Sequence, residues 1–189
     1  MASAGVLIES DVYSIDEGDV PYEVVNGEYR EVEPMSAYST VLANVLMYHL
    51  STAARQQRIG MAVMETLFTL RTEPLLRRQP DVALVHYARW GAGPPHVGMA
   101  WDTVPNLAVE IVSPSNVADD LDQKVVDYLS SGVEEAWILY PESRRMFRHR
   151  SLTEVVVITE RDVIDGGELL PGFSLPLATL FAEAEPPAV

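Results

Sequence analysis

Residues 106–112 (NLAVEIV) constrain the fold more than any other segment, because they are apolar on both sides of an extended strand. Alternate side chains of a strand point to opposite faces, so Ala108, Glu110 and Val112 share one face and the odd-numbered residues share the other. A strand that is apolar on both faces belongs to a sheet that is covered on both faces. We therefore expect an α/β domain, with Glu110 as a carboxylate inside its sheet.

The neighbouring segments predict the elements that would cover this sheet. Residues 22–33 predict an N-terminal β-hairpin, because Asn-Gly favours the turn that matches the twist of two paired strands. Apolar residues at helical spacing predict helices over residues 39–57 and 117–131, with Ser39 as the N-cap of the first. Further strands are predicted at residues 61–71 (one strand or two short ones), 81–87, 106–112, 135–140, 145–149 and 154–159, and a short helix at 177–181.

This order of elements indicates one domain over residues 10–182. We expect a mixed β-sheet with one main helix on each side and the hairpin at the N-terminal end. Residues 1–9 and 183–189 are predicted to be flexible termini. Residues 88–101 are rich in Gly and Pro, and we expect a loop there.

Composition excludes several classes of protein. The 189 residues include no cysteine, which excludes a disulfide scaffold, a thiolate zinc site and a cysteine nucleophile. No apolar run approaches the roughly 20 residues of a membrane span. The first ten residues lack the features of a secretory signal, so we expect a soluble, cytoplasmic protein.

The chain is strongly acidic, with 28 Asp and Glu against 13 Lys and Arg and a net charge of −15. This balance argues against non-specific, high-affinity binding of nucleic acid, although it leaves room for a local basic patch. Twelve of the 13 bases are arginines and one is a lysine, Lys124. Two arginine clusters would either contact phosphates or form solvated surface: Arg71, Arg77, Arg78 and Arg89, and Arg144, Arg145, Arg148 and Arg150.

Two carboxylates on neighbouring predicted strands form a candidate metal site. Glu110 lies within a buried strand, where an ionised carboxylate is costly unless it is paired or binds a metal. Asp81 follows a proline and opens another apolar strand (DVALV), where the plainer interpretation is a turn or cap residue. Together they can bind one hard divalent cation through oxygen.

Two further residues complete the candidate set. Lys124 lies at the edge of the apolar stripe of the second predicted helix, from which its amine can reach the sheet or pair with Asp120 on the helix surface. At the sheet it would orient or help to deprotonate a metal-bound water, or stabilise negative charge on a phosphate. Glu23 lies in the hairpin among other acids, and by spacing alone it would be a surface residue.

Five segments of the sequence resemble a known family: YEVVNGEYREVEPMS, PDVALV, NLAVEIVSPSN, DLDQKVVDYLSSGVEEAWILYP and LLPGFSLPLATLF. Together they are similar to the Uma-type family of bacterial restriction-endonuclease-like proteins, within the PD-(D/E)xK superfamily of phosphodiesterases. The similarity runs from Ser10 to Phe181. The sequence departs from the family pattern at Tyr38, where many relatives have histidine, and at Tyr140, where many have aspartate.

The resemblance implies a role for each candidate residue. Asp81 matches the aspartate of the PD half-motif and Glu110 the acid of the other half. The lysine two positions after that acid is absent, since Val112 stands there, and Lys124 matches the place to which this family moves it. Glu23 matches an additional N-terminal acid of the superfamily.

The resemblance also implies the function that we expect: a DNA endonuclease in which Asp81, Glu110 and the main-chain carbonyl of Ile111 bind Mg²⁺ or Mn²⁺. Glu23 would bind through water or assist a second ion, and Lys124 would position the attacking water. Two alternatives stay open: a binding or regulatory module with little or no catalysis, and a hydrolase of a small phosphodiester. A homodimer is also expected, through the apolar face of the first helix, with Trp90 and Trp101 available for contact.

Overall fold

The computed structural model describes residues 21–91, 100–113 and 118–186. Residues 1–9 and 187–189 of the predicted flexible ends, and residues 92–99 of the Gly- and Pro-rich loop, lie outside this range, whereas residues 183 and 184 of the predicted C-terminal end are helical. The elements are β1 (Tyr22–Val25), β2 (Glu28–Glu31), α2 (Ala37–Gln56), β3 (Gly60–Met64), β4 (Phe68–Thr72), β5 (Leu75–Arg78), β6 (Val82–His86), α3 (Tyr87–Trp90), β7 (Leu107–Ile111), α4 (Ala118–Ser130), β8 (Glu135–Tyr140), β9 (Arg145–His149), β10 (Val155–Thr159), β11 (Val163–Asp165), β12 (Ser174–Pro176) and α5 (Leu177–Ala184).

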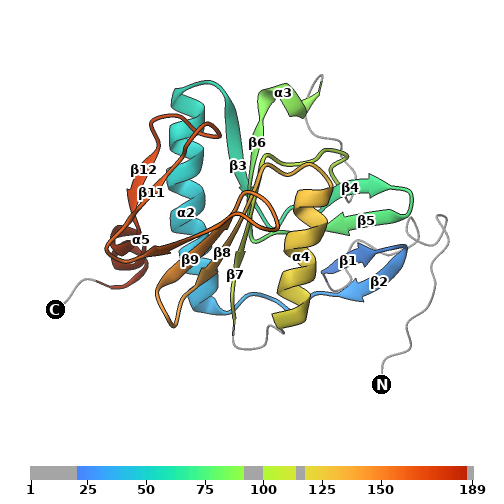
Figure 1. The fold of residues 1–189 in the computed structure, drawn as a ribbon, viewed down its shortest axis with the longest axis horizontal. Coiled ribbons are helices and arrows are strands. Elements are labelled where there is room, and N and C mark those ends of the chain that lie inside the picture. Colours follow the sequence, from blue (N-terminus) through green and yellow to red (C-terminus); the bar gives the residue numbers. More distant parts are fainter. Residues whose placement is uncertain (1–20, 92–99, 114–117, 187–189) are drawn as a thin grey trace.

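A six-stranded sheet in the order β10-β9-β8-β7-β6-β3 forms the centre of the fold, and Figure 1 shows it between α2 on one side and α4 on the other. The β7–β8 pair is parallel, and α4 connects these two strands because parallel neighbours need a crossover. The other neighbours pair antiparallel. The predicted fold class, a mixed sheet flanked by two main helices, is confirmed.

The two faces of the sheet build two different cores, as the alternation in β7 predicts. The odd-numbered residues of β7 pack with Leu42 of α2 and with α5. Ala108 packs on the other face with Tyr128 of α4. Because Glu110 is two residues after Ala108, its carboxylate points toward α4 and away from the α2 side.

Helix α2 begins earlier than the sequence predicted. Its N-cap is Ser36, whose hydroxyl accepts a hydrogen bond from the backbone N–H of Ser39 at 3.1 Å. The prediction of Ser39 as the cap was wrong, because Ser39 is buried inside the first turn. Either serine satisfies the local preference for a small hydroxyl residue, and only the tertiary packing decides between them.

A second sheet, in the order β2-β1-β5-β4, lies beside the first one. The predicted hairpin forms about Asn26 and Gly27, both of which have positive φ (53° and 81°), as the expected turn requires. The predicted strand at 61–71 divides into β3 and β4, which belong to different sheets. Strands β5, β11 and β12 were not predicted.

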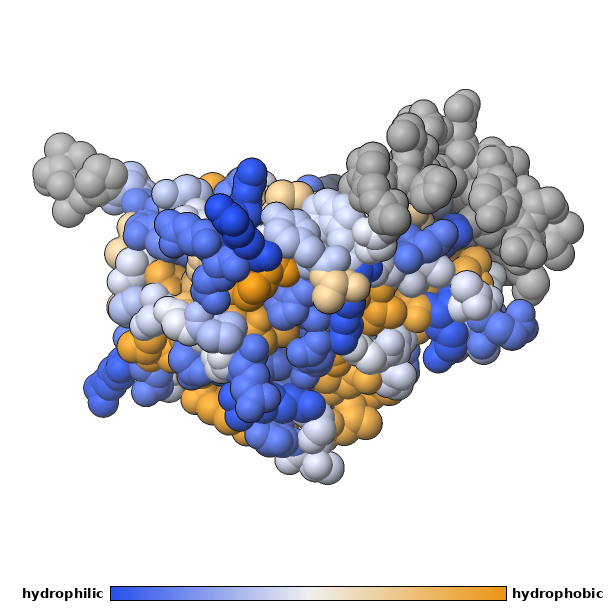
Figure 2. Space-filling view, turned by 90° about the horizontal axis from the view of Figure 1, so that it is seen from above, coloured by the Kyte–Doolittle hydropathy of each residue, from blue (hydrophilic) through white to orange (hydrophobic). Residues whose placement is uncertain are grey.

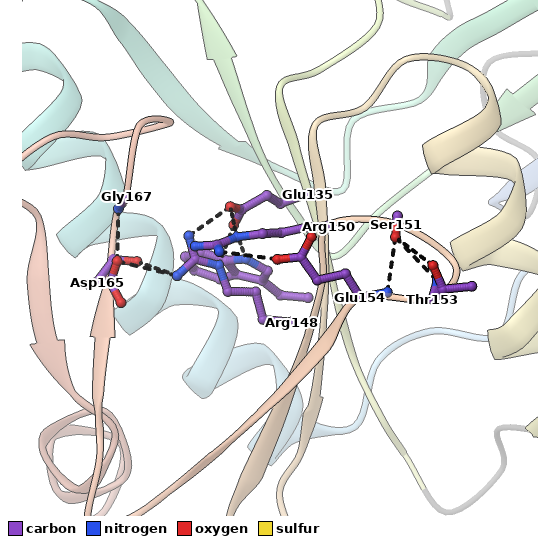
Figure 3. A network of polar contacts seen from close by, with 9 residues as sticks. Glu135, Arg148, Arg150, Ser151, Thr153, Glu154, Asp165 and Gly167 are labelled. Atoms are coloured by element: carbon purple, nitrogen blue, oxygen red, sulfur yellow. Dashed lines mark hydrogen bonds and ion pairs between the residues drawn. The ribbon is translucent and has the colours of Figure 1, made fainter.

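A buried ion-pair network connects the C-terminal strands (Figure 3). Arg148 on β9 is 2% exposed and donates two hydrogen bonds of 2.7 Å to the carboxylate of Glu135 on β8. Its third nitrogen donates to the main-chain carbonyl of Asp165 on β11 at 3.0 Å. Arg150 lies 3.3 Å from the same glutamate. Arg148 therefore cross-links these strands internally, and its guanidinium is not available to contact a phosphate.

The surface that motivated the predicted homodimer is used within the chain. The apolar face of α2 packs on its own sheet through Leu42, Leu46 and Leu50, and Trp101 is only 8% exposed. On the face shown in Figure 2, hydrophobic side chains lie in separate groups among hydrophilic ones. The homodimer stays a prediction, but the apolar face of α2 is not available as its interface. Among the described helices, none has the length and apolar character needed to span a bilayer.

Candidate active site

Glu110 lies at the centre of the candidate site, near the end of β7. Its side chain is 6% exposed. The Tyr128 hydroxyl donates a hydrogen bond of 2.5 Å to Oε1, and the Lys124 ammonium donates one of 2.9 Å to Oε2. Burial raises the pKa of this carboxyl group, while the lysine opposes that rise. Two donors from α4 thus hold a buried acid in the sheet.

Asp81 lies immediately before β6, beside the end of β7. Its Oδ2 accepts a hydrogen bond of 2.5 Å from the backbone N–H of Ile111, the residue after Glu110. Burial and the negative charge of Glu110 raise the pKa of Asp81 to about 7. The structure therefore brings the two acids together on adjacent antiparallel strands, as the sequence predicted.

Lys124 reaches the sheet from the middle of α4. Its Nζ lies 2.9 Å from Oε2 of Glu110 and 3.5 Å from Oε1 of Glu23. The side chain is 15% exposed, so the interpretation of a surface pair with Asp120 does not describe it. The charges of the two glutamates raise the pKa of Lys124 despite its burial, so the amine remains protonated near neutral pH.

Glu23 is buried, although its spacing alone suggested a surface residue. The Arg78 guanidinium donates to its Oε2 at 2.6 Å, and the backbone N–H of Gln79 donates to its Oε1 at 2.9 Å. Arg78 also donates two hydrogen bonds to Oδ2 of Asp127 on α4, at 2.9 and 2.5 Å. The arginine, only 4% exposed, thus bridges two carboxylates inside the protein.

Three residues of this network were not predicted as site residues from the sequence: Arg78, Asp127 and Tyr128. Arg78 was counted among possible phosphate contacts, but it is buried against acids instead. One sequence feature could have indicated the other two: Asp127 and Tyr128 lie three and four residues after Lys124, on the same helix face. An acid and a phenol within that stripe require polar partners when they are buried.

The four candidate residues and Arg78 line a cleft of about 330 Å³. Its acids are Glu23, Glu31, Glu33, Asp81, Glu110 and Asp120, and its cations are Arg30, Arg78 and Lys124. Two of the cations are already ion-paired, so the cleft is negatively charged. This accumulation of oxygen ligands favours a cation over an anion.

The donor set fits a hard divalent ion with a partly hydrated shell. In residues 21–91, 100–113 and 118–186, no group of three or more acids or histidines is arranged to hold a metal. Mg²⁺ often needs only one or two carboxylates and keeps several waters. The raised pKa of Asp81 fits the same interpretation, because burial and the neighbouring charge of Glu110 both disfavour its ionised form, and a bound cation would offset both effects.

Comparison with known proteins supports the fold and the family. A family model, Uma2, described as “Putative restriction endonuclease”, matches residues 9–178. The fold is similar to the crystal structure of a “putative nuclease belonging to DUF820” from Anabaena variabilis, with a TM-score of 0.78 and 16% identity over 93% of this chain and 98% of that one. No curated protein matches the sequence significantly.

Proposed function

This chain belongs to the Uma2 family of restriction-endonuclease-like proteins, and we propose that it is a metal-dependent phosphodiesterase that cleaves DNA. One observation carries the proposal. Asp81 before β6, Glu110 in β7 and Lys124 in α4 converge from three elements on one cleft. Two acids and one amine in a shared cleft are suited to hold a cation and a phosphate together.

We assign the metal to the carboxylates of Asp81 and Glu110 and to the main-chain carbonyl of Ile111, with Mg²⁺ or Mn²⁺ as the ion. When bound, the ion supplies an acidified water and a positive charge for the phosphate. Asp81 keeps its orientation through the Ile111 N–H, and Glu110 keeps its own through Tyr128. These donors fix both carboxylates before any ligand arrives, which reduces the reorganisation that binding requires.

Lys124 acts as a fixed positive charge and hydrogen-bond donor. A lysine that remains protonated near neutral pH does not accept a proton from water. Its ammonium instead orients the attacking water or stabilises charge that develops on the phosphate oxygens. Of the roles that the sequence left open, the electrostatic ones fit the contacts of Lys124 with Glu110 and Glu23.

Glu23 positions the lysine. Both of its oxygens already accept hydrogen bonds, from Arg78 and from the backbone of Gln79, and Oε1 also faces Lys124. The Arg78 bridge to Asp127 ties this glutamate to the helix that carries the lysine. We therefore assign Glu23 to the support of Lys124 ahead of direct metal binding.

The acidic lining of the cleft favours a second candidate, a hydrolase of a small phosphodiester. Such a substrate needs no extended basic surface, whereas a long duplex gains affinity from each cation that contacts a phosphate. A cleavage assay separates these functions. Plasmid DNA, single-stranded DNA, RNA and bis(p-nitrophenyl) phosphate are each incubated with Mg²⁺ or Mn²⁺, using the wild type and Asp81→Asn.

We expect metal-dependent cleavage of DNA by the wild type and its loss in the variant. Cleavage of the small ester alone would support the second candidate. No turnover of any substrate with either ion would contradict both, and would leave a binding module on the same fold. Equal cleavage by wild type and Asp81→Asn would remove this site from the reaction.

A further inference from the structure

A second cavity, of about 540 Å³, adjoins the acidic cleft. It lies between the beginning of α2 and the turn that joins β8 to β9. Ser113 lines both cavities, so they are immediate neighbours on the surface. The volume lies within the range of sites that enclose a small organic molecule, about 300–1,000 Å³.

The lining of this cavity suits a planar ring. Tyr38, Val112, Tyr140 and Pro141 supply apolar and aromatic surface. The ring of Tyr140 is fixed by an edge-on contact with Phe147, with 5.2 Å between the ring centroids. Aromatic side chains with this kind of access stack on nucleobases, and every base offers a face for such stacking.

A cation at the far end of the cavity suits a phosphate. Arg145 lines the cavity and is exposed, and among the described residues its guanidinium takes part in no ion pair or side-chain hydrogen bond. This distinguishes it from Arg78 and Arg148, which are buried in ion pairs. Arg145 also lines the next depression along the surface, beside Arg161.

Arg30 provides a similar charge in the acidic cleft. It lines the acidic cleft, is exposed, and within the described ranges has no side-chain ion pair or hydrogen bond. The acidic cleft therefore combines a free arginine with the Asp81–Glu110 pair, and the adjoining cavity combines two tyrosines with a second free arginine. This combination of cation and aromatic surface matches the backbone and bases of a strand.

We infer that the cavity between Tyr38 and Tyr140 binds an unpaired base of a single-stranded nucleic acid, while Arg145 contacts a phosphate of the same strand. The inference rests on the proposed function, because it places the strand across the acidic cleft. A paired base in a duplex is stacked inside the helix and cannot enter such a cavity without being extruded. The protein therefore binds single strands more tightly than duplexes.

The test is a binding measurement without turnover. Fluorescence anisotropy with EDTA follows a labelled oligodeoxythymidylate of about twelve nucleotides, the same strand in a duplex, and an oligouridylate of equal length. The variants are Tyr38→Leu and Arg145→Gln. The matched controls are Tyr48→Leu and Arg55→Gln, which change exposed residues of α2 that do not line the cavity.

We expect Tyr38→Leu to raise the Kd for the single strand about tenfold, because it removes one stacking partner. Arg145→Gln should lower the slope of log Kd against log salt by about 0.7, the value for one phosphate contact on a single strand. Neither control should differ from the wild type. The oligouridylate shows whether the site distinguishes DNA from RNA.

Duplex binding that equals or exceeds single-strand binding would overturn the inference, and so would variants that bind like their controls. A wild type that binds no single strand would overturn it as well. Because EDTA prevents metal-dependent cleavage, these results are independent of the Asp81→Asn assay. The binding site and the proposed reaction can therefore fail separately.

Discussion

Replacement of Lys124 by methionine tests whether this lysine belongs to the buried network or to the helix surface. Its ammonium contacts Glu110 and Glu23, whose side chains are 6% and 4% exposed. Removal of one partner from a buried ion pair costs about 3–5 kcal/mol, because the remaining charge loses its compensation. An exposed pair with Asp120 would instead contribute only about 0.2–0.5 kcal/mol.

The loss should depend on pH in a defined direction. Without the lysine, the pKa of Glu110 rises further, so the folded variant takes up a proton and avoids the uncompensated charge at low pH. As pH rises through that pKa, the carboxyl must ionise and the variant loses stability. We therefore expect a cost of about 3 kcal/mol at pH 8 that becomes smaller toward pH 5.

Urea unfolding in EDTA measures this cost, with Arg55→Met as a control that removes an exposed cation from α2. Glu110→Gln alone and together with Lys124→Met completes a double-mutant cycle. The two changes should couple by about 1–3 kcal/mol, because Glu110→Gln removes the carboxylate charge that Lys124→Met leaves unpaired. A cost below about 0.5 kcal/mol at every pH would refute the buried network.

Three further outcomes follow from the same contacts. In the folded, metal-free protein the pKa of Asp81 is raised from its ordinary value to about 7, so the protein should lose stability as pH rises from about 4 to 7. Urea unfolding should show a smaller loss for Asp81→Asn, which has no carboxyl group to ionise at this position. Arg148→Met should destabilise by about 3 kcal/mol, the lower end for a broken buried pair, since among the described residues Glu135 keeps only Arg150 and the Trp137 indole as partners, yet calorimetry should find metal binding unchanged. Lys124→Arg should cut turnover in a rate assay by about 10²-fold, because a forked guanidinium cannot replace the compact ammonium between two glutamates.

The sequence predicted the parts of the fold that local patterns determine. The alternation in β7 assigned Glu110 to the same face as Ala108, and Asn26-Gly27 located the hairpin. It missed β5, β11 and β12, which are only three or four residues long. Such strands have too few residues for a recognisable period, and their pairing depends on partners distant in the sequence.

The residues of the candidate site likewise divide into those that the sequence indicates and those that only the fold reveals. Glu110 could be identified because it interrupts an apolar strand, and Lys124 because it is the chain's only lysine. Asp81 became a candidate only in combination with Glu110 and through the family resemblance. Arg78 could not, since an arginine in a polar context predicts surface until the fold brings it to its acidic partners. Which residue pairs with a given charge depends on the tertiary structure. The contact of Arg78 with Glu23 therefore became apparent only from the fold.

Calorimetric titration with Mn²⁺ tests the central claim most directly: that Asp81 and Glu110 hold one divalent ion. The double variant Asp81→Asn, Glu110→Gln removes both carboxylates, and Glu31→Gln is a control that removes an exposed acid from the same cleft. We predict one ion per chain in the wild type and the control, and none in the double variant. Equal binding by the wild type and the double variant would contradict the account.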